Sequence, residues 1–250
     1  MCLCMEVEGM RQKQQKIRHN SHPIKYYGKG IPYVQDTEVK GRLIVIEGPD
    51  ASGRSTQIGM LTTKLEADGH AVLNTGLRRS ELMGEGIMEA KEEHMLGRKT
   101  MSLFYAADFA DRLENKILPA LRSGYIVLAD RYIYTLIARA TVRGLNKRWS
   151  HQLFGFAIEP DLIFYLDVKA EELVHRVFQK NTFLDYYESG ADLGLSDDMY
   201  ESFIIYQRRM AKEFHNMQKR YNLTLIDGNK QILEINAELQ KRIEDFLNKQ

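Results

Sequence analysis

The sequence has little cysteine, no long apolar run and almost no net charge, and each of these absences narrows the class of protein. Its only cysteines, Cys2 and Cys4, lie too close together and too near the terminus to cross-link a fold, which suits a reducing cytoplasm. No apolar run approaches the ~20 residues that a transmembrane helix needs. The net charge of +1 argues against bulk electrostatic binding to nucleic acid or to an anionic membrane. We therefore expect a cytoplasmic protein whose partners include neither a membrane nor a nucleic acid.

Residues 1–40 differ in character from the rest of the chain. The stretch Arg11–Arg18 is basic and polar with little to bury, and Gly28 and Gly30 mark turns. A nucleic-acid-binding arm is the alternative, but a solvated segment is the better interpretation of so short a charged run. We expect residues 1–40 to be an N-terminal extension, poorly ordered or loosely docked, and residues 41–250 to form one domain.

From residue 42 onward, short apolar runs alternate with segments of helical periodicity. The runs lack the polar alternation of a half-exposed strand, which is typical of strands buried on both faces of a parallel sheet. Right-handed crossovers then place functional sites at the carboxyl ends of the strands. The pattern predicts an α/β fold with three layers, a five-stranded parallel sheet with helices on both faces. The expected strands are 43–46, 71–73, 125–129, 162–166 and 223–226, and the expected helices include 55–67, 100–121 and 232–247.

The segment after the first of these strands matches a phosphate-binding loop. The template is Gly-x-x-x-x-Gly-Lys-Ser/Thr between a strand and a helix, where backbone N–H groups and the helix N-terminus together bind phosphate. The glycines allow the backbone to approach the ligand closely, and the hydroxyl of Ser55 is a candidate Mg²⁺ ligand. The predicted ATP-binding residues are Gly48, Asp50, Ala51, Ser52, Gly53, Arg54, Ser55 and Thr56.

Arg54 departs from the template, which has lysine at this position. Arginine keeps the positive charge but is longer, planar and bidentate, so it can contact two phosphate oxygens. A degenerate loop that binds nucleotide weakly is the alternative. Because the rest of the motif is intact, we expect a working loop with Arg54 as a catalytic cation.

A second strand ends in an acid and a base, Asp130 and Arg131. If this strand neighbours the first, both side chains lie beside the phosphate loop. Asp130 is then a candidate for holding Mg²⁺ or orienting the attacking oxygen, and Arg131 for fixing an acceptor phosphate. The alternative is an Asp–Arg pair that only caps the strand and the following helix.

Several motifs in order give the chain a resemblance to the thymidylate kinases, nucleoside monophosphate kinases with a P-loop. The resemblance covers roughly residues 41–247, and it is strongest where five blocks keep the family's spacing. They are the loop Gly48–Thr56 with an acid at its third position, the aromatic block Leu103–Asp108, Asp130-Arg131-Tyr132, the strand Pro160–Asp167 and the segment Leu184–Glu188. The three-layer P-loop kinase fold with a lid at about 177–196 follows as an expectation.

The resemblance implies transfer of the ATP γ-phosphoryl group to dTMP, giving dTDP, with Mg²⁺ and in a homodimer. By match, Asp50 would face the sugar hydroxyl of the acceptor, Arg131 its phosphate, and Phe104 or Tyr105 its base. Ser55 and Asp130 would be the metal ligands. Catalysis would rest on positioning and charge neutralisation.

The chain departs from the family pattern at three places. Phe109 stands where the family has an arginine that reads the base, with Arg112 one helical turn further on. The segment after the second strand offers Arg78 and Arg79 as acceptor-phosphate contacts, without the usual arginine-x-proline. Ala51 removes one source of a transition-state arginine, which leaves Arg176 and Lys180 in the lid region.

These departures keep two other hypotheses open beside a dTMP kinase. A kinase for another nucleotide or nucleoside is suggested by Phe109 and by the altered segment at 76–79. A non-catalytic ATP-binding regulatory protein is suggested by Arg54 and by the few cations of the lid.

Overall fold

The computed structural model describes residues 21–34, 38–77, 80–92, 97–179 and 184–249. Its central sheet has five parallel strands in the order β4-β5-β3-β6-β7. They are β3 (Arg42–Glu47), β4 (Val72–Gly76), β5 (Ile126–Asp130), β6 (Leu162–Asp167) and β7 (Thr224–Asp227). Because β3 pairs with β5, Ile46 lies opposite Asp130. The phosphate loop and the Asp130-Arg131 motif therefore follow neighbouring strand ends. The predicted fold class, a three-layer α/β fold with a five-stranded parallel sheet, is confirmed.

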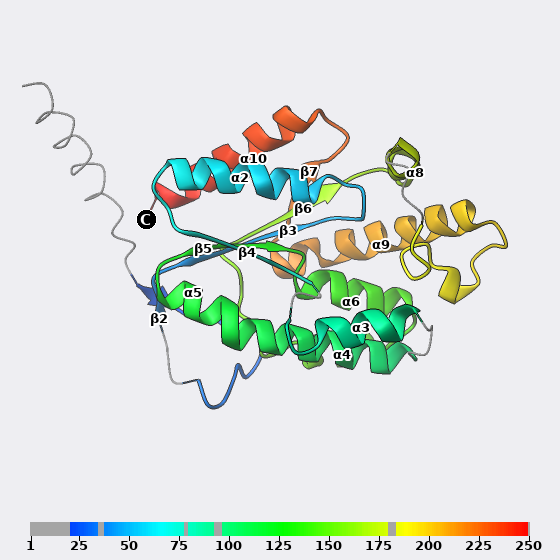
Figure 1. Cartoon of the computed structure of the whole chain (residues 1–250), viewed down its shortest axis with the longest axis horizontal. Coiled ribbons are helices and arrows are strands. Elements are labelled where there is room, and N and C mark those ends of the chain that lie inside the picture. Colours follow the sequence, from blue (N-terminus) through cyan, green and yellow to red (C-terminus); the bar gives the residue numbers. More distant parts are fainter. Residues whose placement is uncertain (1–20, 35–37, 78–79, 93–96, 180–183, 250) are drawn as a thin grey trace, which may run out of the picture.

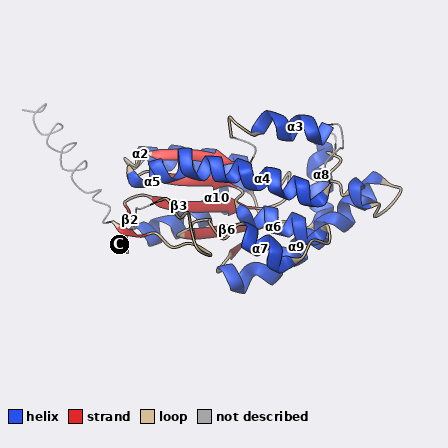
Figure 2. Cartoon of the chain, turned by 90° about the horizontal axis from the view of Figure 1, so that it is seen from below, coloured by secondary structure: helices blue, strands red, loops and turns tan. Residues whose placement is uncertain are grey.

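Helices cover both faces of the sheet (Figures 1 and 2). Alternate residues of each strand point to opposite faces, so β3 contributes Ile44 and Ile46 to one core and Leu43 and Val45 to the other. The first core is closed by α2 (Arg54–Ala67) and α10 (Ile232–Leu247). The second core is covered by α4 (Arg98–Arg112), α5 (Leu118–Arg122), α6 (Ile133–Val142) and α9 (Met199–Tyr221). The shorter helices are α3 (Gly84–Glu92), α7 (Lys147–Leu153), α8 (Ala170–Gln179) and the 3₁₀ turn η2 (Ala191–Leu193).

The helix expected over residues 100–121 is interrupted by a π-helical stretch, η1 (Leu113–Ile117). Pro119 lies at the start of α5 and has no N–H to donate to the carbonyl of residue 115. Widening of the preceding turn accommodates the proline without ending the helix. The sequence pattern missed this change because the apolar spacing runs through it.

The described part of the N-terminal extension packs against the domain. Its strand β1 (His22–Pro23) pairs with β2 (Glu38–Val39). The amide of Tyr27 donates to the carbonyl of Ala157 at 3.1 Å, and Glu159 N–H donates to the Lys25 carbonyl at 2.8 Å. Ile31 joins the larger core. Residues 21–34 therefore follow the segment that leads into β6.

Candidate active site

The phosphate loop joins β3 to α2 at the carboxyl edge of the sheet. A Cβ on Gly48 would lie 2.8 Å from the Ser52 hydroxyl, and Gly53 has a φ of 91°, so a side chain at either position would obstruct or strain the turn. Ala51 also has a positive φ, 62°. Ser55 and Thr56 are exposed in the first turn of α2. The loop thus presents its backbone at a helix N-terminus, as the motif predicts.

Arg54 lies along this loop. Its Nε donates to Asp130 Oδ1 at 2.7 Å, and its Nη1 donates to the carbonyls of Gly48 and Pro49. Its Nη2 is 3.6 Å from Asp50 Oδ1. A lysine has a single side-chain nitrogen, whereas the three guanidinium nitrogens of Arg54 contact both the start of the loop, at residues 48–50, and the end of β5. Arg54 therefore braces the loop against the Asp130 strand end.

Two oxygen atoms converge where a divalent cation would be held. Ser55 Oγ donates to Asp130 Oδ2 at 3.3 Å. A hydroxyl and a carboxylate are ligands that Mg²⁺ accepts, with water and phosphate oxygens completing its octahedron. No cluster of three or more His, Cys, Asp or Glu side chains that could hold a metal occurs among the described residues. The site therefore fits a cation that arrives with the nucleotide phosphates.

Asp50 is the centre of a partly buried charge cluster. Its Oδ1 is 2.5 Å from Arg131 Nη2, and its Oδ2 is 3.6 Å from Arg139 Nη2. Arg139 also contacts Glu188 Oε1 at 3.2 Å, and Arg131 Nη1 is 4.0 Å from the same oxygen. Three elements meet here: the loop, the segment from β5 into α6, and the end of the lid. We call Asp50, Arg131, Arg139 and Glu188 the acceptor cluster.

The two carboxyl groups of this cluster have opposite pKa shifts. Burial raises the pKa of Asp50, but Arg131 and Arg54 outweigh it and hold that pKa well below its usual range. Burial and the neighbouring Asp50 charge raise the pKa of Glu188. Two carboxyl groups that share a site cannot both ionise without cost, so the arginines stabilise one charge first. Asp50 therefore holds its negative charge more strongly than Glu188 does.

Glu47, at the end of β3, fixes the segment that carries Arg131. Its Oε1 accepts from the amides of Tyr132 at 2.9 Å and Thr135 at 3.2 Å, and its Oε2 accepts from Thr135 Oγ1 at 2.5 Å. Glu47 is fully buried, and burial raises its pKa. Arg131 has a φ of 69°, which a non-glycine residue adopts only where its surroundings impose it. The hydrogen bonds to Glu47 hold that conformation.

A small cavity opens beside the acceptor cluster. Its wall is formed by the loop residues 48–50, by Arg131, Thr135 and Arg139, by Glu188, and by side chains of α9. Neither Phe109 nor Arg112 belongs to this wall. A negatively charged ligand entering here would meet the guanidinium groups of Arg131 and Arg139.

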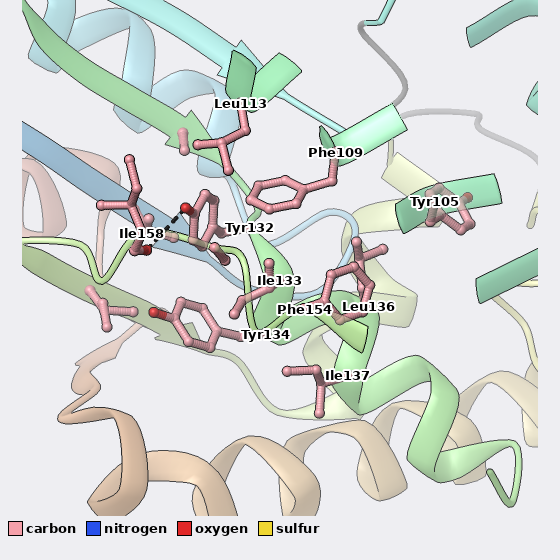
Figure 3. Packing of buried hydrophobic residues seen from close by; sticks show 14 of the residues in the cluster. Tyr105, Phe109, Leu113, Tyr132, Ile133, Tyr134, Leu136, Ile137, Phe154 and Ile158 are labelled. Atoms are coloured by element: carbon pink, nitrogen blue, oxygen red, sulfur yellow. Dashed lines mark hydrogen bonds between the residues drawn. The ribbon is translucent and has the colours of Figure 1, made fainter. Parts of the chain in front are cut away.

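Two aromatic residues of α4, Phe109 and Tyr105, belong to the buried core, where Phe109 faces Tyr132 and Tyr105 lies further along the helix (Figure 3). Phe109 is fully buried, with its ring edge-on to Tyr132 at 4.9 Å between centroids. Arg112 is equally buried in an ion pair with Asp108 at 3.0 Å. Tyr105 lies close enough to Arg139 to raise the pKa of that guanidinium, whereas Phe104 is half-buried against the core. Of the four, Tyr105 is the side chain with an electrostatic contact to the acceptor cluster.

The lid arginine lies on the other side of the loop. Arg176, on α8, donates from Nη2 to the carbonyl of Gly228 at 2.9 Å and from Nη1 to that of Ser52 at 3.5 Å. Its Nε donates to Glu172 at 2.8 Å. It therefore reaches the back of the phosphate loop in this conformation. Arg78, Arg79 and Lys180 lie outside the described residues.

No role was predicted from the sequence for Arg139, Glu188 or Glu47. Arg139 could have been found, because it lies one helical turn after Thr135 and thus on the same face of α6. Glu188 ends a block that the resemblance had identified, yet nothing in its spacing points to Asp50. Glu47 directly follows the expected apolar strand 43–46, and nothing in the sequence pattern points to a role for it.

Comparison with known proteins gives consistent matches. A family model described as thymidylate kinase matches residues 46–239. A probable thymidylate kinase 2 of Saccharolobus solfataricus is 35% identical over 211 residues, covering 84% of this chain and 99% of that protein. A thymidylate kinase of Brachyspira hyodysenteriae is 32% identical, covering 66% of this chain and 82% of that protein. A thymidylate kinase of Halothermothrix orenii is 29% identical, covering 84% of this chain and 100% of that protein. The family match begins after the N-terminal extension.

Proposed function

Because this chain belongs to the thymidylate kinase family, it is a phosphotransferase that converts dTMP to dTDP with ATP, and we propose that the acceptor cluster binds the dTMP. The two alternatives raised by the sequence, a kinase for another nucleotide and a non-catalytic regulator, are not favoured by these matches. The observation that carries the assignment of the site is the position of Asp50 and Arg131, joined at 2.5 Å beside the phosphate loop.

Arg131 and Arg139 fit the acceptor phosphate. Without a ligand they are neutralised by Asp50 and Glu188. A bound phosphate takes over as their counter-ion and frees the Asp50 carboxylate to accept a hydrogen bond from the sugar hydroxyl. The arginines then hold an acceptor oxygen in line with the γ-phosphorus. The new bond forms from that oxygen to phosphorus as the bond to the ADP oxygen breaks. Tyr105 lies nearest to contact the base.

The loop and its neighbours neutralise charge on the donor phosphates. Backbone N–H groups of Ala51 to Ser55 and the guanidinium of Arg54 face the β- and γ-phosphates. Ser55 and Asp130 would hold Mg²⁺, which would neutralise the negative charge that develops on the phosphates. Arg176 approaches the same loop from the lid and is the candidate for the transition-state arginine. Arg78 and Arg79 remain proposed acceptor contacts.

The assembly and location of the protein also remain proposals. The family resemblance supports a homodimer, and exposed apolar side chains on α3 and α4, among them Met88 and Leu103, offer a surface for it. No helix among the described residues is long and apolar enough to cross a membrane. We propose a cytoplasmic location on the same resemblance.

Replacing Asp50 by asparagine tests the site. The change keeps the shape of the side chain and removes the charge that pairs with Arg131. We expect the KM for dTMP to rise at least about tenfold while the KM for ATP changes less than about threefold. The matched control is Asp198→Asn, at the N-cap of α9, where asparagine caps as well as aspartate. An unchanged KM for dTMP in Asp50→Asn would remove the acceptor role.

A further inference from the structure

A second cavity lies under the N-terminal extension. Its volume is about 880 Å³, and its wall combines residues 27–30 with α7, the segment Gly155–Phe156 and the end of α9. None of its lining residues belongs to the phosphate loop, to the acceptor cluster or to the lid. Its size suits a ligand as large as a nucleotide.

The charged side chains around this cavity are all basic. Its wall contains Lys29, Lys147, Arg148, His151 and Arg220, and no aspartate or glutamate. Lys147 is paired with Glu213 at 2.8 Å. No ion pair joins Lys29 or Arg148 to another residue in the part of the chain that the structure describes. Burial lowers the pKa of His151, Arg220 and Lys147 lower it further, and Glu213 opposes them.

The rest of the wall is aromatic and held closely to the domain. Tyr27 and Phe156 contribute half-buried rings. A Cβ on Gly28 would lie 2.9 Å from the Gly155 carbonyl oxygen, so the extension approaches this segment as closely as glycine allows. A ligand with several negative charges would form ion pairs with the basic side chains, and an aromatic ring on it would pack against the apolar part of the wall.

We propose that this cavity binds a nucleoside polyphosphate at a site separate from the catalytic one. Arg148, Arg220 and Lys29 bind the phosphates, and Tyr27 with Phe156 receives the base. The hydroxyl of Tyr27 contacts that of Tyr134 at 2.5 Å, and Tyr134 lies in the first turn of α6, three residues beyond Arg131. The ligand therefore contacts a side chain that is directly connected to the segment carrying the acceptor arginine.

Calorimetric titration of the full chain with ATP, without acceptor, tests the proposal. We expect the wild-type chain to bind a second molecule of ATP that Arg148→Gln/Arg220→Gln loses, with affinity at the second site reduced at least about tenfold. The control Lys241→Gln/Lys249→Gln removes the same charge from α10 and the residues after it, outside the cavity wall, and should retain both sites. Because no phosphoryl transfer is measured, the outcome does not depend on the acceptor assignment.

Two further measurements make the result decisive. Lys29→Gln alters only the extension, so it leaves the domain folded and should weaken the second site by itself. Inorganic triphosphate, which lacks a base, should bind that site at least about tenfold more weakly than ATP. A single ATP site in the wild type, a second site retained in the double variant, or equal binding of triphosphate would each overturn the proposal.

Discussion

At the scale of single residues, Arg54 is the side chain that distinguishes this phosphate loop. Its guanidinium binds Asp130 and the carbonyls of Gly48 and Pro49, so it contacts the proposed metal ligand and the loop backbone together. A lysine has a single nitrogen and cannot keep all of these contacts. With Ala51 in the loop, Arg54 is the arginine that the loop itself carries. We interpret Arg54 as a working replacement that supplies charge the loop would otherwise lack.

The variant Arg54→Lys tests this interpretation. We expect turnover with dTMP to fall about tenfold, because the variant restores the usual residue without restoring an arginine elsewhere. Arg242→Lys is the matched control, since Arg242 also pairs with a carboxylate through Nε and Nη2, but on the surface of α10. Turnover several-fold above that of the wild-type chain would show that Arg54 impairs the loop instead of compensating for a missing arginine.

At the scale of elements, Arg143 connects α6 to the lid and to α9. Its Nη1 donates to the Tyr206 hydroxyl at 2.7 Å, its Nη2 to the Tyr187 carbonyl at 2.7 Å, and its Nε to Asp192 at 2.8 Å. The side chain is buried, so the hydrogen bonds are screened little by water. Tyr187 precedes Glu188, and the lid turn that delivers Glu188 to Asp50 thus depends on Arg143.

Replacing Arg143 by lysine should loosen this connection. Lysine keeps the charge but leaves buried acceptors without partners, so the free energy of unfolding should fall by about 2–4 kcal/mol. Urea denaturation measures the change. Arg209→Lys, an exposed position on α9, should alter it by less than about 0.5 kcal/mol. Equal stability of the two variants would mean that the lid end is held by other contacts.

The helices and strands also show how much of the fold could be predicted from the sequence. Four of the five strands and the helix at 232–247 were predicted to within one residue, because apolar spacing and local propensity agree there, whereas β4 extends three residues beyond the expected end at 73. The π-helical turn before Pro119 was missed because it depends on the packing of the whole helix. The loop, Asp130 and Arg131 were identified from motifs. Arg139, Glu188 and Glu47 were not, because their roles arise from contacts between segments distant in the sequence.

At the scale of the whole molecule, the described residues 21–34 of the N-terminal extension pack against the domain. Tyr27 stacks edge-on with Tyr134 and Tyr221, at 6.2 and 5.0 Å between ring centroids, and donates or accepts a hydrogen bond with Tyr134. The basic stretch 11–18, from which a loose segment was predicted, lies outside the described residues. Within residues 21–34, the tyrosines and Ile31 provide apolar contacts with the domain.

Two tyrosine-to-phenylalanine variants measure the strength of this docking. Tyr27→Phe leaves the buried Tyr134 hydroxyl without its partner and should lower the free energy of unfolding by about 1–2 kcal/mol. Tyr33→Phe removes a hydrogen bond to Glu114 from a side chain that is 70% exposed, and should change stability by less than about 0.5 kcal/mol. If Tyr27→Phe were as stable as Tyr33→Phe, the extension would contribute nothing measurable to the fold.

The most direct test of the function is turnover of the full chain across a panel of acceptors. With ATP and Mg²⁺, we expect dTDP formation from dTMP, with kcat/KM at least about tenfold above that for dUMP or CMP, and no transfer to thymidine, which lacks the phosphate that we propose Arg131 to hold. Tight ATP binding without phosphoryl transfer to any acceptor would contradict the account.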